Sequence, residues 1–131
     1  MNKIQIIDLP KILDPRGNLS FFENSNQIPF DIKRTYWIYD VPGGKMRGSH
    51  AFKESQEFII ALSGSFDVVL NDGVKEVTHS LNNSFTGLYV PNLIWRSLKN
   101  FSTNSLALIV SNIVYDKQDY ILDFDEFKKI K

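Results

Sequence analysis

Residues 57–78 read EFIIALSGSFDVVLNDGVKEVT, and they give the clearest indication of the fold class. Its first six residues are dominated by strand-forming side chains and predict a buried β-strand. Ser63-Gly64-Ser65 predicts a tight turn, after which residues 66–70 form a second strand. Asn71-Asp72-Gly73 is a hairpin signal, and the alternating residues 74–78 are the return strand. Three strands joined by short turns favour an antiparallel, all-β protein.

Similar runs of β-branched and aromatic residues recur along the rest of the chain, separated by turn-forming residues. They predict further strands at residues 4–7, 19–23, 34–39, 86–91 and 106–110. Helical spacing is confined to the end of the chain, where Tyr120, Phe124 and Phe127 recur within residues 119–129. About eight or more short strands in roughly 110 residues are typical of a jelly roll. We therefore expect residues 1–131 to form one all-β domain with a short C-terminal helix.

Composition excludes several classes of protein. The chain has 131 residues, and its 15 Lys and Arg balance 15 Asp and Glu, so no general attraction to nucleic acid or anionic lipid is expected. It has no Cys, which excludes disulfides, thiolate metal sites and a cysteine nucleophile. No apolar run approaches the roughly 18 residues of a membrane span, and the start of the chain lacks the layout of a signal peptide. A soluble, cytoplasmic protein is the expectation.

The two histidines lie in different settings. His79 ends a polar hairpin strand, so a surface position is expected for it. His50 directly precedes the most apolar strand and has Arg47 and Lys53 close by. A loop histidine with satisfied hydrogen bonds is the ordinary interpretation of such a residue, but the pattern around His50 favours a functional role.

That pattern resembles the first motif of the cupins, a His-x-His pair followed by a Glu and then a Gly. The corresponding residues here are His50, Phe52, Glu57 and Gly64. In the second cupin motif a Pro is followed five residues later by a His, and here Pro91 is followed by Arg96. The resemblance implies a cupin-type double-stranded β-helix. Metal cupins use three His and one Glu, whereas Phe and Arg offer no ligand, so we expect no metal.

Six segments in order resemble the sugar-nucleotide 3,4-ketoisomerases, the FdtA/WxcM-like group. They are residues 14–17, 28–36, 47–51, 62–65, 87–90 and 115–121. The resemblance implies a small cupin-like homodimer that exchanges N-terminal strands. It also implies conversion of dTDP-4-keto-6-deoxyglucose to its 3-keto isomer, which an aminotransferase then uses to make 3-amino sugars for bacterial surface glycans.

The chemistry of this reaction matches side chains in the resembling segments. Moving a ketone from C4 to C3 requires removal of the C3 proton, an enediol or enediolate, and return of a proton at C4, with no redox cofactor. A histidine is a suitable proton carrier, cations and phenols stabilise the enolate oxygen, and arginines bind diphosphate. The predicted catalytic residues are His50, Tyr36 and Glu57. The predicted substrate-binding residues are Arg16, Arg34, Arg47 and Arg96.

The chain departs from the family pattern at the second imidazole, where Phe52 stands. A phenylalanine can neither accept nor give a proton. Glu57 is therefore either a second proton carrier in its place or the ion-pair partner of a nearby arginine. Family members of different product stereochemistry vary at the positions of Arg16 and Arg96, and this combination of two arginines leaves the configuration at C4 open.

Three functions remain after these departures. The first is an active 3,4-ketoisomerase that uses His50. The second is a related dTDP-sugar epimerase with an altered pocket. The third is a catalytically weak homologue that binds a nucleotide sugar, or a partner enzyme, without turning the sugar over. Exchange of the C3 proton with solvent deuterium separates an active ketoisomerase from a binding protein.

Overall fold

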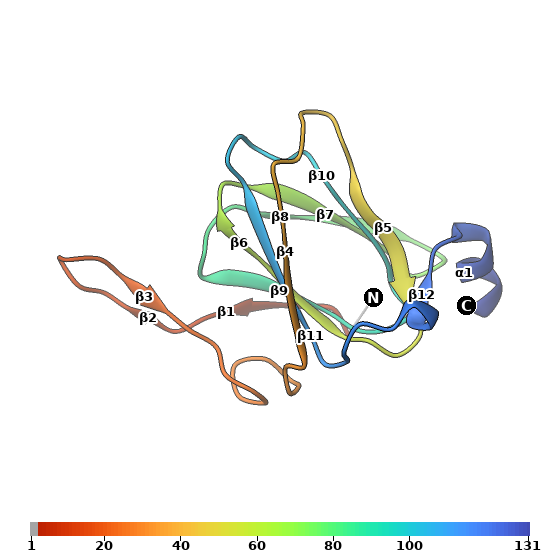
Figure 1. The fold of residues 1–131 in the computed structure, drawn as a ribbon, viewed down its shortest axis with the longest axis horizontal. Coiled ribbons are helices and arrows are strands. Elements are labelled where there is room, and N and C mark those ends of the chain that lie inside the picture. Colours follow the sequence, from red (N-terminus) through yellow and green to blue (C-terminus); the bar gives the residue numbers. More distant parts are fainter. Residues whose placement is uncertain (1–2) are drawn as a thin grey trace.

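The computed structural model describes residues 3–131, which form two five-stranded antiparallel β-sheets that face each other (Figure 1). The first sheet contains, in spatial order, β1 (Gln5–Asp8), β9 (Thr86–Val90), β6 (Glu57–Ser63), β11 (Leu106–Ser111) and β4 (Arg34–Tyr39). The second contains β12 (Tyr120–Ile121), β5 (Arg47–Phe52), β10 (Trp95–Lys99), β7 (Phe66–Asn71) and β8 (Glu76–Leu81). The predicted all-β jelly roll is confirmed.

Three smaller elements lie outside the two sheets. A hairpin of β2 (Lys11–Ile12) and β3 (Leu19–Ser20) projects away from the barrel (Figure 1). A 3-10 turn, η1 (Lys117–Asp119), precedes β12, and the helix α1 (Phe124–Ile130) ends the chain. The helix is shorter than the predicted segment 119–129, because Asp123 caps it by accepting a hydrogen bond from the backbone of Asp125. Within residues 3–131, no helix has the length and apolar character needed to span a membrane.

The hairpin of β7 and β8 differs from its prediction by two residues. The return strand begins at Glu76 rather than at Val74. The carboxylate of Asp72 accepts hydrogen bonds from the backbone N–H groups of Val74 and Lys75, at 2.8 and 2.9 Å. These bonds extend the turn to Lys75, so strand pairing starts at Glu76, two residues later than predicted.

The space between the sheets is divided along the strands into a polar end and an apolar end. The inward-facing residues of β4 run from Arg34 and Tyr36 to the buried Ile38, and those of β6 run from Glu57 to Ile59 and Ala61. The apolar end continues into the main core, which contains Phe66, Val68, Leu70, Leu88 and Leu98. This core fixes the strand ends that carry the polar side chains.

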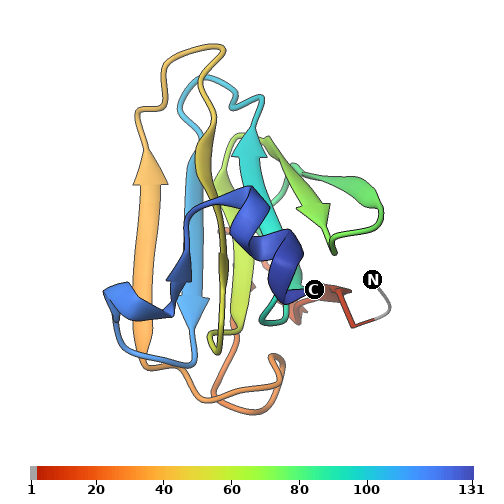
Figure 2. The ribbon, with the colours of Figure 1, turned by 90° about the vertical axis from the view of Figure 1, so that its right-hand side faces the viewer.

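Two further apolar clusters cover the outer faces of the sheets. Residues Ile28 and Phe30 of the segment before β4 pack on Phe58 and Ile60 of the first sheet. On the second sheet, α1 lies against the outer face (Figure 2), and its Phe127 packs with Ala51 and Trp95. The strand β5 is therefore supported from outside by the C-terminal helix, while its inner face stays available for function.

Candidate active site

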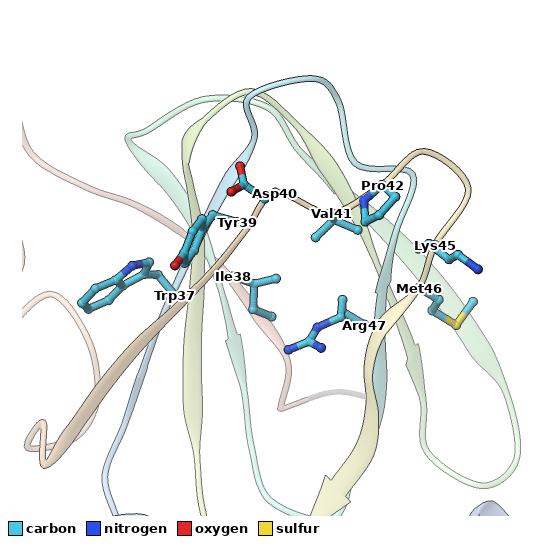
Figure 3. A pocket seen from close by; sticks show the side chains of 9 residues that line it. All are labelled: Trp37, Ile38, Tyr39, Asp40, Val41, Pro42, Lys45, Met46 and Arg47. Atoms are coloured by element: carbon cyan, nitrogen blue, oxygen red, sulfur yellow. The ribbon is translucent and has the colours of Figure 1, made fainter.

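A cavity of about 400 Å³ opens between β4 and β5, at the polar end of the barrel. Its lining comes from four strands and contains Arg34, Tyr36, Trp37, Ile38, Arg47, Gly48, Ser49, His50, Arg96 and Tyr120. A second cavity of about 410 Å³ adjoins it under the loop between β4 and β5, and shares three of these residues. Figure 3 shows Ile38 and Arg47 pointing toward each other across that second cavity, whereas Trp37 and Tyr39 project to the other side of β4.

A buried ion pair forms the floor of the first cavity. Arg96 and Glu57 are each only 1% exposed, and Arg96 Nε donates to Glu57 Oε1 at 2.9 Å. The Nη2 group of Arg96 donates to Glu57 Oε2 at 3.2 Å and to the Tyr36 hydroxyl at 2.8 Å. That hydroxyl in turn donates to Glu57 Oε2. Glu57, Arg96 and Tyr36 thus form one closed network of charge-assisted hydrogen bonds.

The charges in this network are stabilised by each other. Burial opposes the charge of Arg96, but Glu57, Tyr36 and Tyr120 together more than offset it, so the pKa of Arg96 is raised. Burial also raises the pKa of Tyr36 far above its usual value, and the Glu57 carboxylate adds to that effect. Tyr36 therefore stays a neutral phenol whose proton is held by Glu57.

Gly48 makes room for the guanidinium of Arg96. Its φ of 67° lies in the left-handed region, and a Cβ atom built on it would overlap Nη1 of Arg96. The same Nη1 donates to the Gly48 carbonyl at 2.8 Å. A glycine is required here on both counts, for backbone conformation and for the close approach.

His50 lies opposite Arg96 on the neighbouring strand. Its ring packs edge-on against Phe52 and Tyr120, with centroid distances of 4.8 and 4.9 Å. Nδ1 of His50 is buried and has no hydrogen-bond partner among residues 3–131. Burial, followed by the positive charges of Arg96 and Arg34, lowers the pKa of His50 to about 3. At neutral pH this imidazole is uncharged and able to accept a proton.

Arg34 and Tyr120 close the cavity on its other side. Nη1 of Arg34 donates to the Tyr120 hydroxyl at 2.8 Å, and the guanidinium lies 4.3 Å from the Tyr36 ring centroid. Arg47 is exposed at the rim and forms no ion pair within the described part of the chain. The site therefore has one ion-paired arginine in its floor, the half-buried Arg34 in its wall and the exposed Arg47 at its rim.

The remaining predicted residue, Arg16, lies elsewhere in this chain. It sits at the tip of the β2–β3 hairpin with its side chain 90% exposed, and its guanidinium pairs with Asp14 at 2.8 Å. This contact lowers the pKa of Asp14 and raises that of Arg16. The structure thus does not bring Arg16 to the cavity within one chain, because the hairpin projects away from the barrel (Figure 1).

Five of the seven predicted site residues line the cavity: His50, Tyr36, Arg34, Arg47 and Arg96. Glu57 lies behind them, and both of its carboxylate oxygens accept hydrogen bonds from Arg96. Sequence reasoning missed Tyr120, although it belongs to a segment that resembles the family. The signal available in the sequence was its place in that segment, residues 115–121. Only the structure shows β12, which pairs Tyr120 with Phe52 beside His50.

The metal site of other cupins does not fit these residues. Phe52 and Arg96 stand at two of the four ligand positions, and the carboxylate of Glu57 is already paired with Arg96. Among residues 3–131, no group of three or more His, Asp or Glu side chains is close enough together to hold a metal ion. The chemistry of the cavity is that of a neutral imidazole among fixed cations and phenols.

Comparisons with known proteins point to one family. The FdtA family model, described as WxcM-like, C-terminal, matches residues 2–131. TDP-4-oxo-6-deoxy-alpha-D-glucose-3,4-oxoisomerase from Aneurinibacillus thermoaerophilus is 39% identical over 127 residues, which cover 95% of this chain and 90% of that protein.

Solved structures agree in fold over nearly the whole chain. The WlaRB TDP-quinovose 3,4-ketoisomerase from Campylobacter jejuni has a TM-score of 0.94 at 39% identity, covering 98% of this chain and 99% of that chain. A point mutant of the 3,4-ketoisomerase QdtA from Thermoanaerobacterium thermosaccharolyticum, in complex with TDP-4-keto-6-deoxyglucose, has a TM-score of 0.97 at 32% identity. That match covers 99% of this chain and 94% of the other.

Proposed function

This chain belongs to the FdtA family of WxcM-like 3,4-ketoisomerases, and we propose that it converts dTDP-4-keto-6-deoxyglucose to its 3-keto isomer. The observation that carries the proposal is the neutral His50 imidazole, which lines a cavity together with Arg34, Arg47 and Arg96. An imidazole can accept a proton, and cations in the same cavity stabilise the negatively charged enolate that forms when a proton is removed next to a carbonyl group.

In the proposed mechanism His50 removes the proton from C3 of the sugar. The electron pair of the C3–H bond forms the C3–C4 double bond, and negative charge develops on the C4 oxygen. The buried Arg96 and the nearby Arg34 stabilise this charge without reorganisation, because both are already held in place by hydrogen bonds. The C4 oxygen takes a proton, and the C3 hydroxyl gives one up as the C3 carbonyl forms. Return of a proton at C4 completes the isomerisation, and no redox cofactor is involved.

Glu57 and Tyr36 support this chemistry in different ways. Both carboxylate oxygens of Glu57 are paired with Arg96, which favours the ion-pair interpretation of this residue. Tyr36 lines the cavity and receives a hydrogen bond from Arg96. We assign Glu57 to fixing the Arg96 charge, and Tyr36 to contacting the sugar at the edge of the same network.

The diphosphate of the substrate is assigned to Arg47, whereas Arg34 faces the sugar. Arg47 stands exposed at the rim, where both cavities meet, so its guanidinium can pair with a phosphate. Arg34 lies deeper and is oriented by Tyr36 and Tyr120. Arginine forks match the geometry of phosphate oxygens, and each charge-assisted contact contributes about 1.5–3 kcal/mol.

The proposed assembly is a homodimer in which the β2–β3 hairpins are exchanged. The hairpin exposes three large apolar residues, with Ile12 at 55%, Leu13 at 74% and Leu19 at 54%. Strand β1 pairs with β9 of the same chain, so the part available for exchange is the hairpin beyond it. Packed on a second copy, the hairpin would bury these side chains and carry Arg16 toward the partner's cavity.

The substrate also suggests where the reaction belongs. A nucleotide-activated sugar as substrate favours a cytoplasmic location. A 3-keto sugar nucleotide is the form that an aminotransferase needs to place an amino group at C3, and 3-amino sugars of this kind enter bacterial surface glycans. We propose that this chain supplies that aminotransferase step.

Incubation with dTDP-4-keto-6-deoxyglucose in D2O, followed by NMR, tests the function. The expected result is loss of the C3 proton signal to deuterium together with appearance of the 3-keto isomer. Exchange with inversion of a carbon centre, and without the 3-keto isomer, would identify an epimerase. A protein that is stabilised thermally by the sugar nucleotide but exchanges no proton would be a binding homologue. His50→Asn is the matched inactive control.

A further inference from the structure

Tyr120 lies beside His50, and the mechanism described so far gives its hydroxyl no part in proton transfer. It comes from the two-residue strand β12, lines the cavity, and places its ring centroid 4.9 Å from that of His50 and 4.7 Å from that of Phe52. In register it stands directly opposite Phe52, where the resembling family has its second imidazole. The phenol of Tyr120, which can give a proton, thus packs against Phe52, which cannot.

The hydroxyl of Tyr120 differs from that of Tyr36 in what it is bound to. The Tyr36 hydroxyl donates its proton to Glu57. The Tyr120 hydroxyl accepts a hydrogen bond from Nη1 of Arg34 at 2.8 Å, and no acceptor within residues 3–131 takes its proton. Tyr120 is therefore a phenol in the cavity lining with a proton free for a substrate oxygen and a cation at its own oxygen.

We propose that Tyr120 is a catalytic residue of the isomerisation, carrying the proton that moves between the two substrate oxygens while His50 carries the carbon-bound proton. This role rests on the proposed function. It explains how a chain with one imidazole in its cavity completes a reaction in which a hydrogen must change place both on carbon and on oxygen.

The two transfers balance without a further reactant. His50 takes the proton from C3, the C3–H electron pair forms the C3–C4 double bond, and the carbonyl π pair moves to the C4 oxygen, which takes the Tyr120 proton. The C3 hydroxyl then returns a proton to the Tyr120 oxygen as the C3 carbonyl forms. The double-bond pair accepts the proton from His50 at C4. Both side chains end in their starting states.

Arg34 and Asp119 prepare Tyr120 for this role. The guanidinium of Arg34, bound to the phenol oxygen, stabilises the phenolate that exists between the two transfers. Asp119, next to Tyr120, is buried and accepts hydrogen bonds from the backbone of Glu54 and Ser55 at 2.7 and 3.1 Å. This clamp ties β12 to the turn after β5, so the phenol is held at a fixed position beside His50.

The test compares Tyr120→Phe with Tyr115→Phe. The first keeps the ring that packs on His50 and removes only the hydroxyl. The second removes a hydroxyl from an exposed ring that lies 5.8 Å from that of Tyr120 and is not part of the cavity lining. Turnover and KM are measured on dTDP-4-keto-6-deoxyglucose, with TDP affinity from calorimetry and melting temperature as checks on structure.

We expect Tyr120→Phe to lower kcat by about 10²–10⁴, with KM and TDP affinity changed by less than about threefold. Tyr115→Phe should match the wild type. The double variant His50→Asn/Tyr120→Phe should be little slower than the slower single variant, because the two groups act in one sequence of transfers. Full turnover by Tyr120→Phe, or a loss confined to KM and TDP affinity, would overturn the role of Tyr120. A wild-type protein without isomerisation would instead overturn the proposed function itself.

Discussion

His50 is kept uncharged by its surroundings rather than by a hydrogen bond. Burial and the charges of Arg96 and Arg34 disfavour the imidazolium, and Nδ1 lacks a partner among the described residues. The same environment that keeps His50 uncharged at neutral pH carries a cost in stability under acid conditions, because the unfolded chain can bind a proton that the folded chain binds only weakly.

This cost predicts a specific dependence of unfolding on pH. The pKa of His50 is lowered from 6.5 to about 3 in the folded protein. Between these pH values the unfolded state binds more protons than the folded state. The titration of His50 therefore leaves the free energy of unfolding unchanged above pH 6.5 and lowers it as the pH decreases toward 3, by up to about 1.4 kcal/mol per pH unit. Urea unfolding of the wild type and of His50→Asn at pH 7 and pH 5 measures it. We expect the wild type to lose more stability than the variant, and equal losses would contradict this account.

Glu57 is either the ion-pair partner that stabilises Arg96 or a second proton carrier, and one substitution distinguishes these roles. Glu57→Gln removes the charge that balances the buried Arg96, and breaking a buried pair in this way costs about 3–5 kcal/mol. Urea unfolding at pH 7 should show this loss, while Glu23→Gln, at an exposed position, should leave stability nearly unchanged. A variant with native stability but greatly reduced turnover would instead identify Glu57 as a proton carrier.

Arg47 offers the cleanest test of diphosphate binding, because it is exposed and forms no ion pair within residues 3–131. Its removal should cost the substrate a charge-assisted contact and little else. Arg47→Ala is expected to weaken TDP binding by roughly 10- to 100-fold in calorimetry. Lys75→Ala, which removes an exposed cation from the turn between β7 and β8, should bind TDP as the wild type does. Unchanged affinity in both variants would place the diphosphate elsewhere.

Strands with apolar alternation were predictable, whereas β5 and β10, which also contribute residues to the site, were not. The sequence predicted β4, β6, β7 and β11 because bulky strand formers occupy their inward positions. It predicted no strand at β5, whose inward positions are Gly48, His50 and Phe52. Because two of the three inward positions of β5 are not apolar, this strand lacks the hydrophobic alternation by which strands are recognised in a sequence.

The role of β10 was hidden for the same reason. Its inward Arg96 was recognised as a departure from the cupin pattern, and the sequence assigned it to substrate binding. What the sequence left open was which residue pairs with Arg96, and the structure shows that it is Glu57. The register of β11 with both neighbours places Arg34 and Glu57 in one row, opposite Ser111. Such a row depends on strand order and on one-residue register, neither of which local spacing determines.

Gly48 links the shape of β5 to the floor of the cavity. Gly48→Ala forces a side chain into the left-handed region, at a cost of about 1–2 kcal/mol, and displaces the Arg96 guanidinium that lies against it. We expect loss of both stability and turnover, measured by urea unfolding and by the NMR assay. Gly43→Ala, where a Cβ meets nothing within 4 Å and φ is not positive, should change neither. A fully active Gly48→Ala protein would show that the Arg96 position is not needed.

At the scale of the whole molecule, stability and chemistry occupy opposite ends of one interior. The apolar end holds the sheets together, and the polar end opens between β4 and β5, which face each other across the cavity without pairing. The overall fold was predictable because it follows from the majority of apolar positions. The position of Arg16 was not, because the hairpin that carries it projects from the barrel and leaves its side chain 90% exposed.

If the projecting hairpins are exchanged between two chains, a dimer of two different variants can be active where neither variant is active alone. If each cavity uses His50 of one chain and Arg16 of the other, a single working site draws on two polypeptides. Pairing an Arg16→Ala chain with a His50→Asn chain then concentrates both defects in one site and leaves the second site intact.

Two separately impaired proteins should therefore complement each other. When they are unfolded together, refolded and allowed to pair at random, half of the dimers are mixed and each has one intact site, so about a quarter of the wild-type activity should return. Refolding each variant alone should restore none of it. A mixture no more active than the average of its two parents would mean that every chain builds its site by itself.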